Sequence, residues 1–188
     1  MDETSKQLLS DVREPLPVQP GLPQRIDYEY QREGVADLFM FFEPLTGKRF
    51  VRVTNQRTRK DWAQAMKEVA DEIYPQAEKI ILVMDNLNTH SPVSFYETFE
   101  PDEARRLMER FEFHYTPKHG SWLNMAEIEL GVLIRQCLSR RISDKETLEC
   151  EVKAWQADRN SKVVKIDWRF TTADARIKLK HLYPVIQV

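Results

Sequence analysis

Residues 120–134 read GSWLNMAEIELGVLI, and this stretch sets the first constraint on the fold. Four side chains recur at steps of four, three and four residues and so share one face of a predicted helix: Leu123, Glu127, Leu130 and Ile134. A carboxylate on such an apolar face costs several kcal/mol unless a cation meets it. We therefore expect Glu127 to point inward for a chemical reason. Glu129 lies about 200° further round the helix and is expected to face water.

A second acid directly follows an apolar run. Residues 80–84 read IILVM and predict a buried strand, and Asp85 is the next residue. In open α/β sheets, ligands gather beyond the carboxyl ends of the strands, where Asp85 would lie. Together with an inward Glu127, it offers the oxygen ligands that a hard divalent cation prefers. Two structural alternatives remain open: Asp85 as a turn cap, and Glu127 in a buried ion pair with an arginine.

Length and composition favour a single globular domain. The chain has 188 residues, of which 41% are hydrophobic and 31% charged. Its net charge of −2 argues against a nucleic-acid binder that is basic throughout, although arginines and lysines cluster locally. No stretch approaches the roughly 18 apolar residues of a membrane span. Cys137 and Cys150 form no Cys-x-x-Cys pair, which disfavours a zinc knuckle and fits a reduced, cytoplasmic setting.

The order of the predicted elements indicates an α/β layered sheet that mixes antiparallel and parallel strands. Residues 11–35 contain several prolines and are expected to be irregular. Residues 38–42 and 49–54 predict a hairpin whose first strand is covered on both faces. Helices are expected over residues 58–74 and from 101, 121, 143 and 171, with strands over 79–84 and 111–115. No domain boundary is evident within residues 1–188.

Two longer strings resemble a known family. Residues 83–90 read VMDNLNTH, and residues 115–127 read YTPKHGSWLNMAE. They look like the catalytic core of DDE transposases from bacterial insertion sequences of the mariner-related superfamily, and the similarity extends to WRFTTADAR at residues 168–176. The resemblance implies a ribonuclease-H-like mixed sheet flanked by helices. It also implies that Asp85 is the second catalytic acid and Glu127 the third.

The first acid of the family pattern is best matched by Asp2, which Glu3 follows as is common in the family. In this family the acid comes after an apolar strand, whereas here only Met1 precedes it. Asp27 and Asp37 are alternative first acids. The resemblance thus predicts an incomplete first strand and the absence of the upstream helix-turn-helix region. Residues 1–188 would then form one catalytic domain of a longer transposase.

By the same resemblance, the expected function is metal-dependent DNA cleavage and strand transfer during transposition. Asp2, Asp85 and Glu127 would hold two Mg²⁺ or Mn²⁺ ions and carry the catalysis. The implied partners are DNA, as transposon ends and target, and a second copy of the chain in a homodimer. No membrane is involved, and the expected location is the nucleoid of a bacterial cytoplasm. The alternatives are another metal nuclease of the same fold, a truncated and inactive fragment that binds DNA or a full-length partner, and a plain structural module.

Several polar or aromatic residues lie close to the acids in the sequence and are candidates for DNA or phosphate contacts: Asn86, Asn88, His90, Lys118, His119 and Trp122. Each has a structural alternative as well. A histidine in a loop is often a surface residue, the asparagines suit turns, and the tryptophan could pack beneath the helix start rather than stack on a base.

Overall fold

The structure contains two sheets that adjoin at the start of the chain. It is a computed structural model that describes residues 1–87, 89–117 and 120–180. The first sheet is antiparallel with the order β1-β2-β3, formed by β1 (Asp2–Asp11), β2 (Tyr30–Glu43) and β3 (Lys48–Thr54). The second is a parallel pair of β4 (Ile80–Met84) and β5 (Phe111–Tyr115). The amino group of Met1 donates to the Val83 carbonyl oxygen at 2.5 Å, so β1 begins beside β4.

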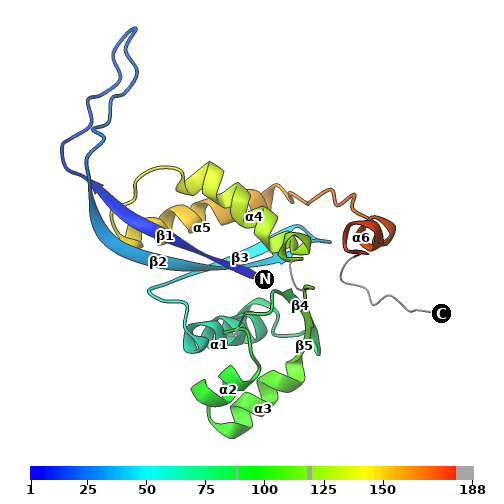
Figure 1. The fold of residues 1–188 in the computed structure, drawn as a ribbon. Helices are drawn as coiled ribbons and strands as arrows, with labels where there is room; N and C mark the ends of the chain where they lie inside the picture. Colours follow the sequence, from blue (N-terminus) through cyan, green and yellow to red (C-terminus); the bar gives the residue numbers. More distant parts are fainter. Residues whose placement is uncertain (88, 118–119, 181–188) are drawn as a thin grey trace.

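Helices cover both faces of the β1-β2-β3 sheet (Figure 1). Their bounds are α1 (Arg59–Glu68), α2 (Val93–Thr98), α3 (Pro101–Arg110), α4 (Met125–Leu133), α5 (Lys145–Ser161) and α6 (Thr172–Lys178). Short π-helical turns η1 (Val69–Ile73) and η3 (Ile134–Leu138) extend α1 and α4, and a 3₁₀ turn, η2 (Ser121–Leu123), precedes α4. In Figure 1, α4 and α5 lie on one side of this sheet, and α1 to α3 lie with β4 and β5 on the other. Within the described ranges, no helix has the length and apolar character needed to cross a membrane.

The apolar run of β2 explains this layering. Its alternate side chains enter different cores, because successive residues of a strand point to opposite faces. Phe39 and Phe41 pack in the core that contains Trp62, whereas Leu38 and Met40 pack in the core beneath α4 and α5. All four are nearly or completely buried. The expectation that this strand is covered on both faces is therefore confirmed.

Most predicted elements are present, but the first 35 residues differ from the prediction. β1 is a ten-residue strand that starts at Asp2, and β2 begins at residue 30, inside the stretch expected to be irregular. The sequence pattern concealed both strands. Residues 2–7 read DETSKQ, and residues 30–35 lie on an exposed part of the sheet, so neither segment alternates clearly between apolar and polar residues. The long antiparallel pairing of β1 with β2 supplies their structure instead.

A long arm, residues 12–29, connects β1 with β2 and projects from the body of the molecule (Figure 1). Two isolated bridges hold its strands together, and Pro20 and Gly21 form its tip, where Gly21 takes a φ of 78° that suits glycine. Arg141 fixes the base of the arm. Its guanidinium donates to the Asp11 carboxylate at 2.5 Å and to the carbonyl oxygens of residues 27–29.

Candidate active site

The three predicted acids lie at the junction of the two sheets with α4. Asp2 is the first residue of β1, Asp85 directly follows β4, and Glu127 lies in the first turn of α4. The start of β1 lies beside the end of β4 because the Met1 amino group donates a hydrogen bond to the Val83 carbonyl oxygen. This hydrogen bond places Asp2 and Asp85, which lie 83 positions apart in the chain, at the same junction of the two sheets.

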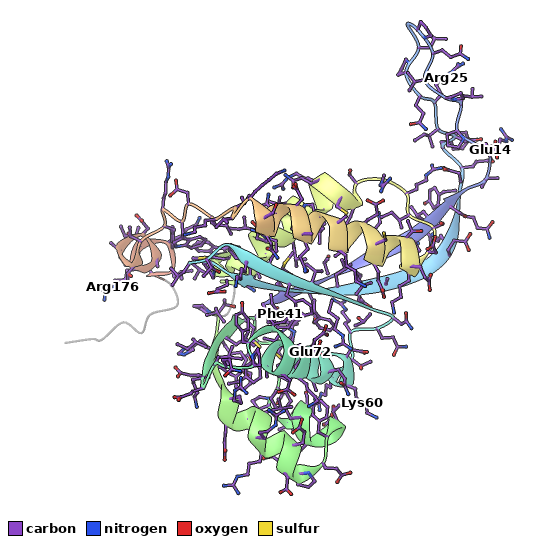
Figure 2. The ribbon with its side chains drawn as sticks, turned by 180° about the vertical axis from the view of Figure 1, so that it is seen from behind. Glu14, Arg25, Phe41, Lys60, Glu72 and Arg176 are labelled. Atoms are coloured by element: carbon purple, nitrogen blue, oxygen red, sulfur yellow. The ribbon has the colours of Figure 1, made fainter. Side chains whose placement is uncertain are left out.

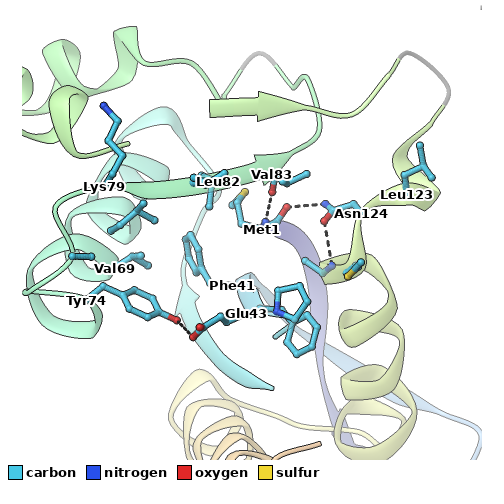
Figure 3. Close-up of a pocket in the computed structure, with 17 residues that line it drawn as sticks. Met1, Phe41, Glu43, Val69, Tyr74, Lys79, Leu82, Val83, Leu123 and Asn124 are labelled. Atoms are coloured by element: carbon cyan, nitrogen blue, oxygen red, sulfur yellow. Dashed lines mark hydrogen bonds between the residues drawn. The ribbon is translucent and has the colours of Figure 1, made fainter. Parts of the chain in front are cut away.

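Asn124 attaches the start of α4 to the same place. Its side chain is buried, donates to the Met1 carbonyl oxygen at 2.8 Å and accepts from the backbone N–H of Ala126 at 3.2 Å (Figure 3). It is thus both the N-cap of α4 and the link to the residue before Asp2. The sequence analysis missed this role. An asparagine three residues before a glutamate at a helix start is a capping signal that could have revealed it.

The charges of Asp85 and Glu127 both reach Asp2. Burial raises the pKa of Asp2 from its ordinary value of 3.8 to about 6. A hydrogen bond from the Glu3 N–H at 2.9 Å and the Met1 amino group oppose this rise, while the negative charges of Asp85 and Glu127 add to it. Like charges that raise a carboxyl pKa must lie within a short range. The three carboxylates therefore form one electrostatic cluster.

His90 lies between two carboxylates beneath this cluster. Its Nδ1 is 2.7 Å from Asp85 Oδ1, and its Nε2 is 3.1 Å from Glu3 Oε2. Burial alone would lower the pKa of His90, but the hydrogen bond with Glu3 and the charges of both carboxylates outweigh it, so the pKa is raised. His90 is 1% exposed, so its ring is enclosed by the protein, and its role as a phosphate contact stays a prediction.

The predicted faces of α4 are reversed in the structure. Glu127 is exposed, and Glu129 is the buried glutamate, at 1% exposure. Glu129 accepts from Arg159 Nη2 at 2.9 and 3.2 Å and lies 3.0 Å from Arg49 Nε. The buried ion pair considered for Glu127 therefore exists two residues further on. Glu127 lies at the surface, within range of an electrostatic effect on Asp2, where an external ligand can reach it.

The two alternative first acids lie in other surroundings. Asp37, in β2, is buried, accepts from Ser5 Oγ at 2.5 Å and lies 3.9 Å from Arg57 Nε. Asp27 belongs to the projecting arm and lies 3.2 Å from Arg13 Nη1. Neither contributes to the raised pKa of Asp2, whereas Asp85 and Glu127 do. Asp2 remains the best candidate for the first acid.

The remaining predicted contact residues divide into two groups. Asn86 is exposed in the loop after Asp85, as a DNA contact would need to be. Trp122 is half-buried, with its ring edge-on to Phe170 at 4.9 Å between centroids and Lys178 Nζ 4.5 Å from its own centroid. It therefore packs against the C-terminal segment, a contact that the sequence analysis did not expect, and its role as a DNA contact stays a prediction. Three predicted contacts fall outside the described residues: Asn88, Lys118 and His119.

A cavity of about 450 Å³ lies beside the Met1 end of β1 (Figure 3). Its wall is largely apolar and includes Phe41, Val69 and Leu82, with Tyr74 donating to Glu43 Oε2 at 3.0 Å. None of the three acids lines it. An apolar chamber of this kind does not suit a charged phosphodiester, so the reactive groups of the site lie outside this cavity.

Comparison with known families decides the assignment. A family model described as "DDE superfamily endonuclease" matches residues 1–149. The chain belongs to the DDE endonuclease superfamily. The match includes Asp2, Asp85 and Glu127 and runs from β1 into α5. Membership makes the chain a nuclease-type protein with DNA as the implied substrate. Comparisons with curated proteins and with solved structures give no match.

DDE endonucleases typically use divalent metals, and the donor set of this chain fits them in part. Among the residues that the structure describes, no three His, Cys, Asp or Glu side chains are arranged to hold a metal ion. However, Asp85 Oδ1 is buried without an aligned hydrogen-bond donor, since Nδ1 of His90 approaches it off-axis. Burial is the main cause of the raised pKa of Asp2, and the negative charges of Asp85 and Glu127 add to it. A hard cation would bind carboxylate oxygens of this kind and offset their charge.

The raised pKa of Asp2 has a measurable consequence for the stability of the metal-free DDE domain. Because the folded pKa is about 6 and the ordinary value 3.8, the folded state binds the proton more tightly. This contribution is complete below pH 3.8 and is lost as the pH rises to about 6. We expect Asp2→Asn to be more stable than the parent at pH 7.5 by about 1–2 kcal/mol, a value discounted for partial solvent exposure.

Urea unfolding in EDTA at pH 4 and at pH 7.5 measures this difference. The gain from Asp2→Asn should be small at pH 4 and larger at pH 7.5. Asp102→Asn, at an exposed position in α3, is the control and should show no such dependence. An equal effect of Asp2→Asn at both pH values would contradict the assignment of the raised pKa to this residue.

Proposed function

We propose that this chain is the catalytic domain of a transposase related to the mariner superfamily, which cuts DNA and joins the freed 3′ end to target DNA. The observation that supports the proposal is the placement of Asp2 at the start of β1, Asp85 directly after β4 and Glu127 in the first turn of α4, where the charges of Asp85 and Glu127 both reach Asp2. Membership of the DDE endonuclease superfamily supports the nuclease part. The strand-transfer part, and the ribonuclease-H-like arrangement of the sheet, rest on the sequence resemblance. Its place in a bacterial cell would be the nucleoid.

The three acids have distinct positions in the proposed chemistry. Asp2, Asp85 and Glu127 would hold two Mg²⁺ or Mn²⁺ ions, which when bound lower the pKa of an attacking water and neutralise charge on the leaving oxygen. Glu127 lies at a helix N-terminus, a favourable position for an acidic side chain. Asn124 fixes that helix start against Met1. Cleavage and joining are both in-line displacements at phosphorus, so one rigid site can serve both steps.

Basic residues of the C-terminal segment support a DNA surface next to this site. The contacts of Trp122 with Phe170 and Lys178 hold the segment against the turn that precedes α4. Arg176, labelled in Figure 2, is exposed in α6, and Lys165 and Lys180, before and after this helix in the sequence, are exposed as well. No ion pair involves these three cations among the described residues. Exposed cations beside a nuclease site can bind the phosphate backbone.

The arm supports the proposed homodimer. Residues 12–29 expose several apolar side chains that a monomer would leave in water: Val12, Leu16, Val18, Leu22, Ile26 and Tyr28. In Figure 2 the side chains of this arm, including labelled Glu14 and Arg25, lie away from the body. We propose that a second copy of the chain covers them.

Shortening the arm tests the homodimer. Replacing residues 13–28 by an Asn-Gly turn should keep the β1–β2 hairpin and convert a dimer into a monomer, as measured by light scattering coupled to size-exclusion chromatography. Leu45→Asp, at the exposed turn between β2 and β3, is the control that should stay dimeric. A monomeric parent, or a dimeric shortened chain, would refute the proposal.

A nicking and joining assay tests the catalytic proposal. The purified chain is incubated with supercoiled plasmid and with a labelled duplex oligonucleotide, in Mg²⁺, in Mn²⁺ and in EDTA. We expect nicked plasmid with either metal, none in EDTA, and covalently joined label when the duplex carries its own transposon-end sequence. Nicking without joining on such an end would favour a plain metal nuclease.

The second candidate function is a DNA-binding member of the family that does not cut. The observation in its favour is that, among residues 1–87, 89–117 and 120–180, no three His, Cys, Asp or Glu side chains are arranged to hold a metal ion. Mn²⁺ titration followed by paramagnetic resonance separates the two candidates. DNA binding without Mn²⁺ binding or nicking would establish the non-catalytic function.

A further inference from the structure

A buried histidine connects the first strand with the loop that carries the second acid. His90 Nε2 is 3.1 Å from Glu3 Oε2, and Glu3 is the neighbour of Asp2 in β1. On the other side of the ring, Nδ1 is 2.7 Å from Asp85 Oδ1 and 3.3 Å from the Asp85 carbonyl oxygen. One imidazole therefore spans from the residue after the first acid to the second acid itself.

The surroundings hold the ring in place. The side chain of His90 is 0% exposed and that of Glu3 only 3%, while Asp85 keeps 24% exposure. The ring stacks on Trp62 at 6.1 Å between centroids. Tyr115 Oη donates to the His90 carbonyl at 3.2 Å. Glu3 and His90 are therefore enclosed by the protein, and of the three groups only Asp85 reaches solvent.

The position of Asp85 depends on few other contacts. Its Oδ1 is buried and lacks an aligned hydrogen-bond donor. The polar group that lies nearest to it is Nδ1 of His90, at 2.7 Å. A carboxylate that must bind a cation benefits from a neighbour that limits its rotation without occupying all its lone pairs. The ring of His90 provides such a neighbour.

We infer that His90 is a positioning residue of the DNA-cleavage site: through Nδ1, it fixes the Asp85 carboxylate so that Asp85 and Asp2 can face one divalent cation. The inference rests on the proposed function. It assigns His90 no contact with DNA and no proton transfer. Glu3 contacts the far side of the ring, and the contact that positions Asp85 is that of Nδ1.

Two amide variants separate positioning from a merely structural role. The side-chain nitrogen of asparagine reaches about as far as Nδ1 of histidine, and that of glutamine about as far as Nε2. His90→Asn therefore retains a donor toward Asp85 and loses the link to Glu3, whereas His90→Gln retains the link to Glu3 and loses the donor toward Asp85. Both variants replace a buried ring by a smaller polar group, so their effects on stability should be similar.

The measurement is Mn²⁺ binding to the full chain by paramagnetic resonance, with urea unfolding in parallel. Loss of a group that orients a metal ligand typically weakens binding by 10–100-fold. We expect His90→Gln to weaken Mn²⁺ binding at least tenfold and His90→Asn to stay within about threefold of the parent. If His90→Gln does not fold, His90→Asn alone decides, and a tenfold loss in that variant would overturn the inference.

The outcomes also separate this inference from the proposed function. If the parent chain binds no Mn²⁺, both the proposed catalytic function and the role of His90 are rejected, because Asp85 then has no cation to bind. A parent that binds Mn²⁺, with His90→Gln folded and binding equally well, rejects only the role of His90. Equal losses in the two variants would likewise reject it, because a general packing defect does not depend on which carboxylate is contacted.

Discussion

Asp85→Asn and Glu127→Gln are each expected to lower the rate of metal-dependent DNA nicking by about a thousandfold or more while the chain stays folded. Each change keeps the size of the side chain and removes a charged oxygen ligand. A thousandfold loss corresponds to about 4 kcal/mol of transition-state stabilisation. That is a plausible share for one ligand of a site whose catalysis is almost wholly electrostatic. The rate of plasmid nicking in Mn²⁺, at equal amounts of folded protein, measures the loss.

Glu146→Gln is the matched control. Glu146 lies in the first turn of α5, as Glu127 does in α4, but on an exposed helix start away from the acids. It should nick DNA at the parental rate. Urea unfolding should show that Glu127→Gln is about as stable as the parent, because its side chain is exposed and forms no ion pair among the described residues. Full nicking activity in Glu127→Gln would end the assignment of this acid.

Much of the site was predictable because its signals are local. The run at residues 80–84 is apolar throughout and predicts β4. The next residue, Asp85, is thereby placed at the end of this strand. The strand at residues 111–115 and the helix starts near residues 58 and 101 also follow from short patterns, and the structure has them. The family strings then linked Asp85 with Glu127. These features need no knowledge of distant contacts.

The faces of α4 could not be predicted from periodicity. Nearly every residue from 125 to 134 is apolar, so several stripes fit the helix equally well. The structure buries Ala126, Glu129, Leu130 and Leu133, a stripe that contains the other glutamate. What selects this stripe is the pair of arginines from β3 and α5, and a partner so far away in sequence leaves no local signal. For the same reason, the burial of His90 by Glu3 could not be foreseen.

Glu129→Ala is expected to destabilise the fold by about 3–5 kcal/mol. The Glu129 carboxylate lies between Arg159 and Arg49, with side-chain exposures of 2%, 12% and 0%. Removing it leaves two guanidinium groups close together without a counter-charge in a nearly dry environment. Since these residues join β3, α4 and α5, the change should loosen the whole layer above the sheet. The free energy of unfolding in urea measures the loss, and a loss below about 1 kcal/mol would contradict this account.

The remaining groups around Arg49 explain why the cost should come from the lost charge rather than from lost packing. Arg49 also donates to the Val164 carbonyl at 2.6 Å, and its guanidinium lies 5.2 Å from the Phe42 ring centroid, so its position persists without Glu129. A charge held in place by other contacts cannot escape to water. Glu129→Gln retains the size of the side chain and one acceptor oxygen but loses the negative charge. It should therefore be destabilised by a similar amount. If Glu129→Gln instead matches the parent, the glutamate contributes through shape alone. The contrast with Glu127→Gln, two residues earlier, then measures directly which glutamate of α4 supports the fold and which is free for chemistry.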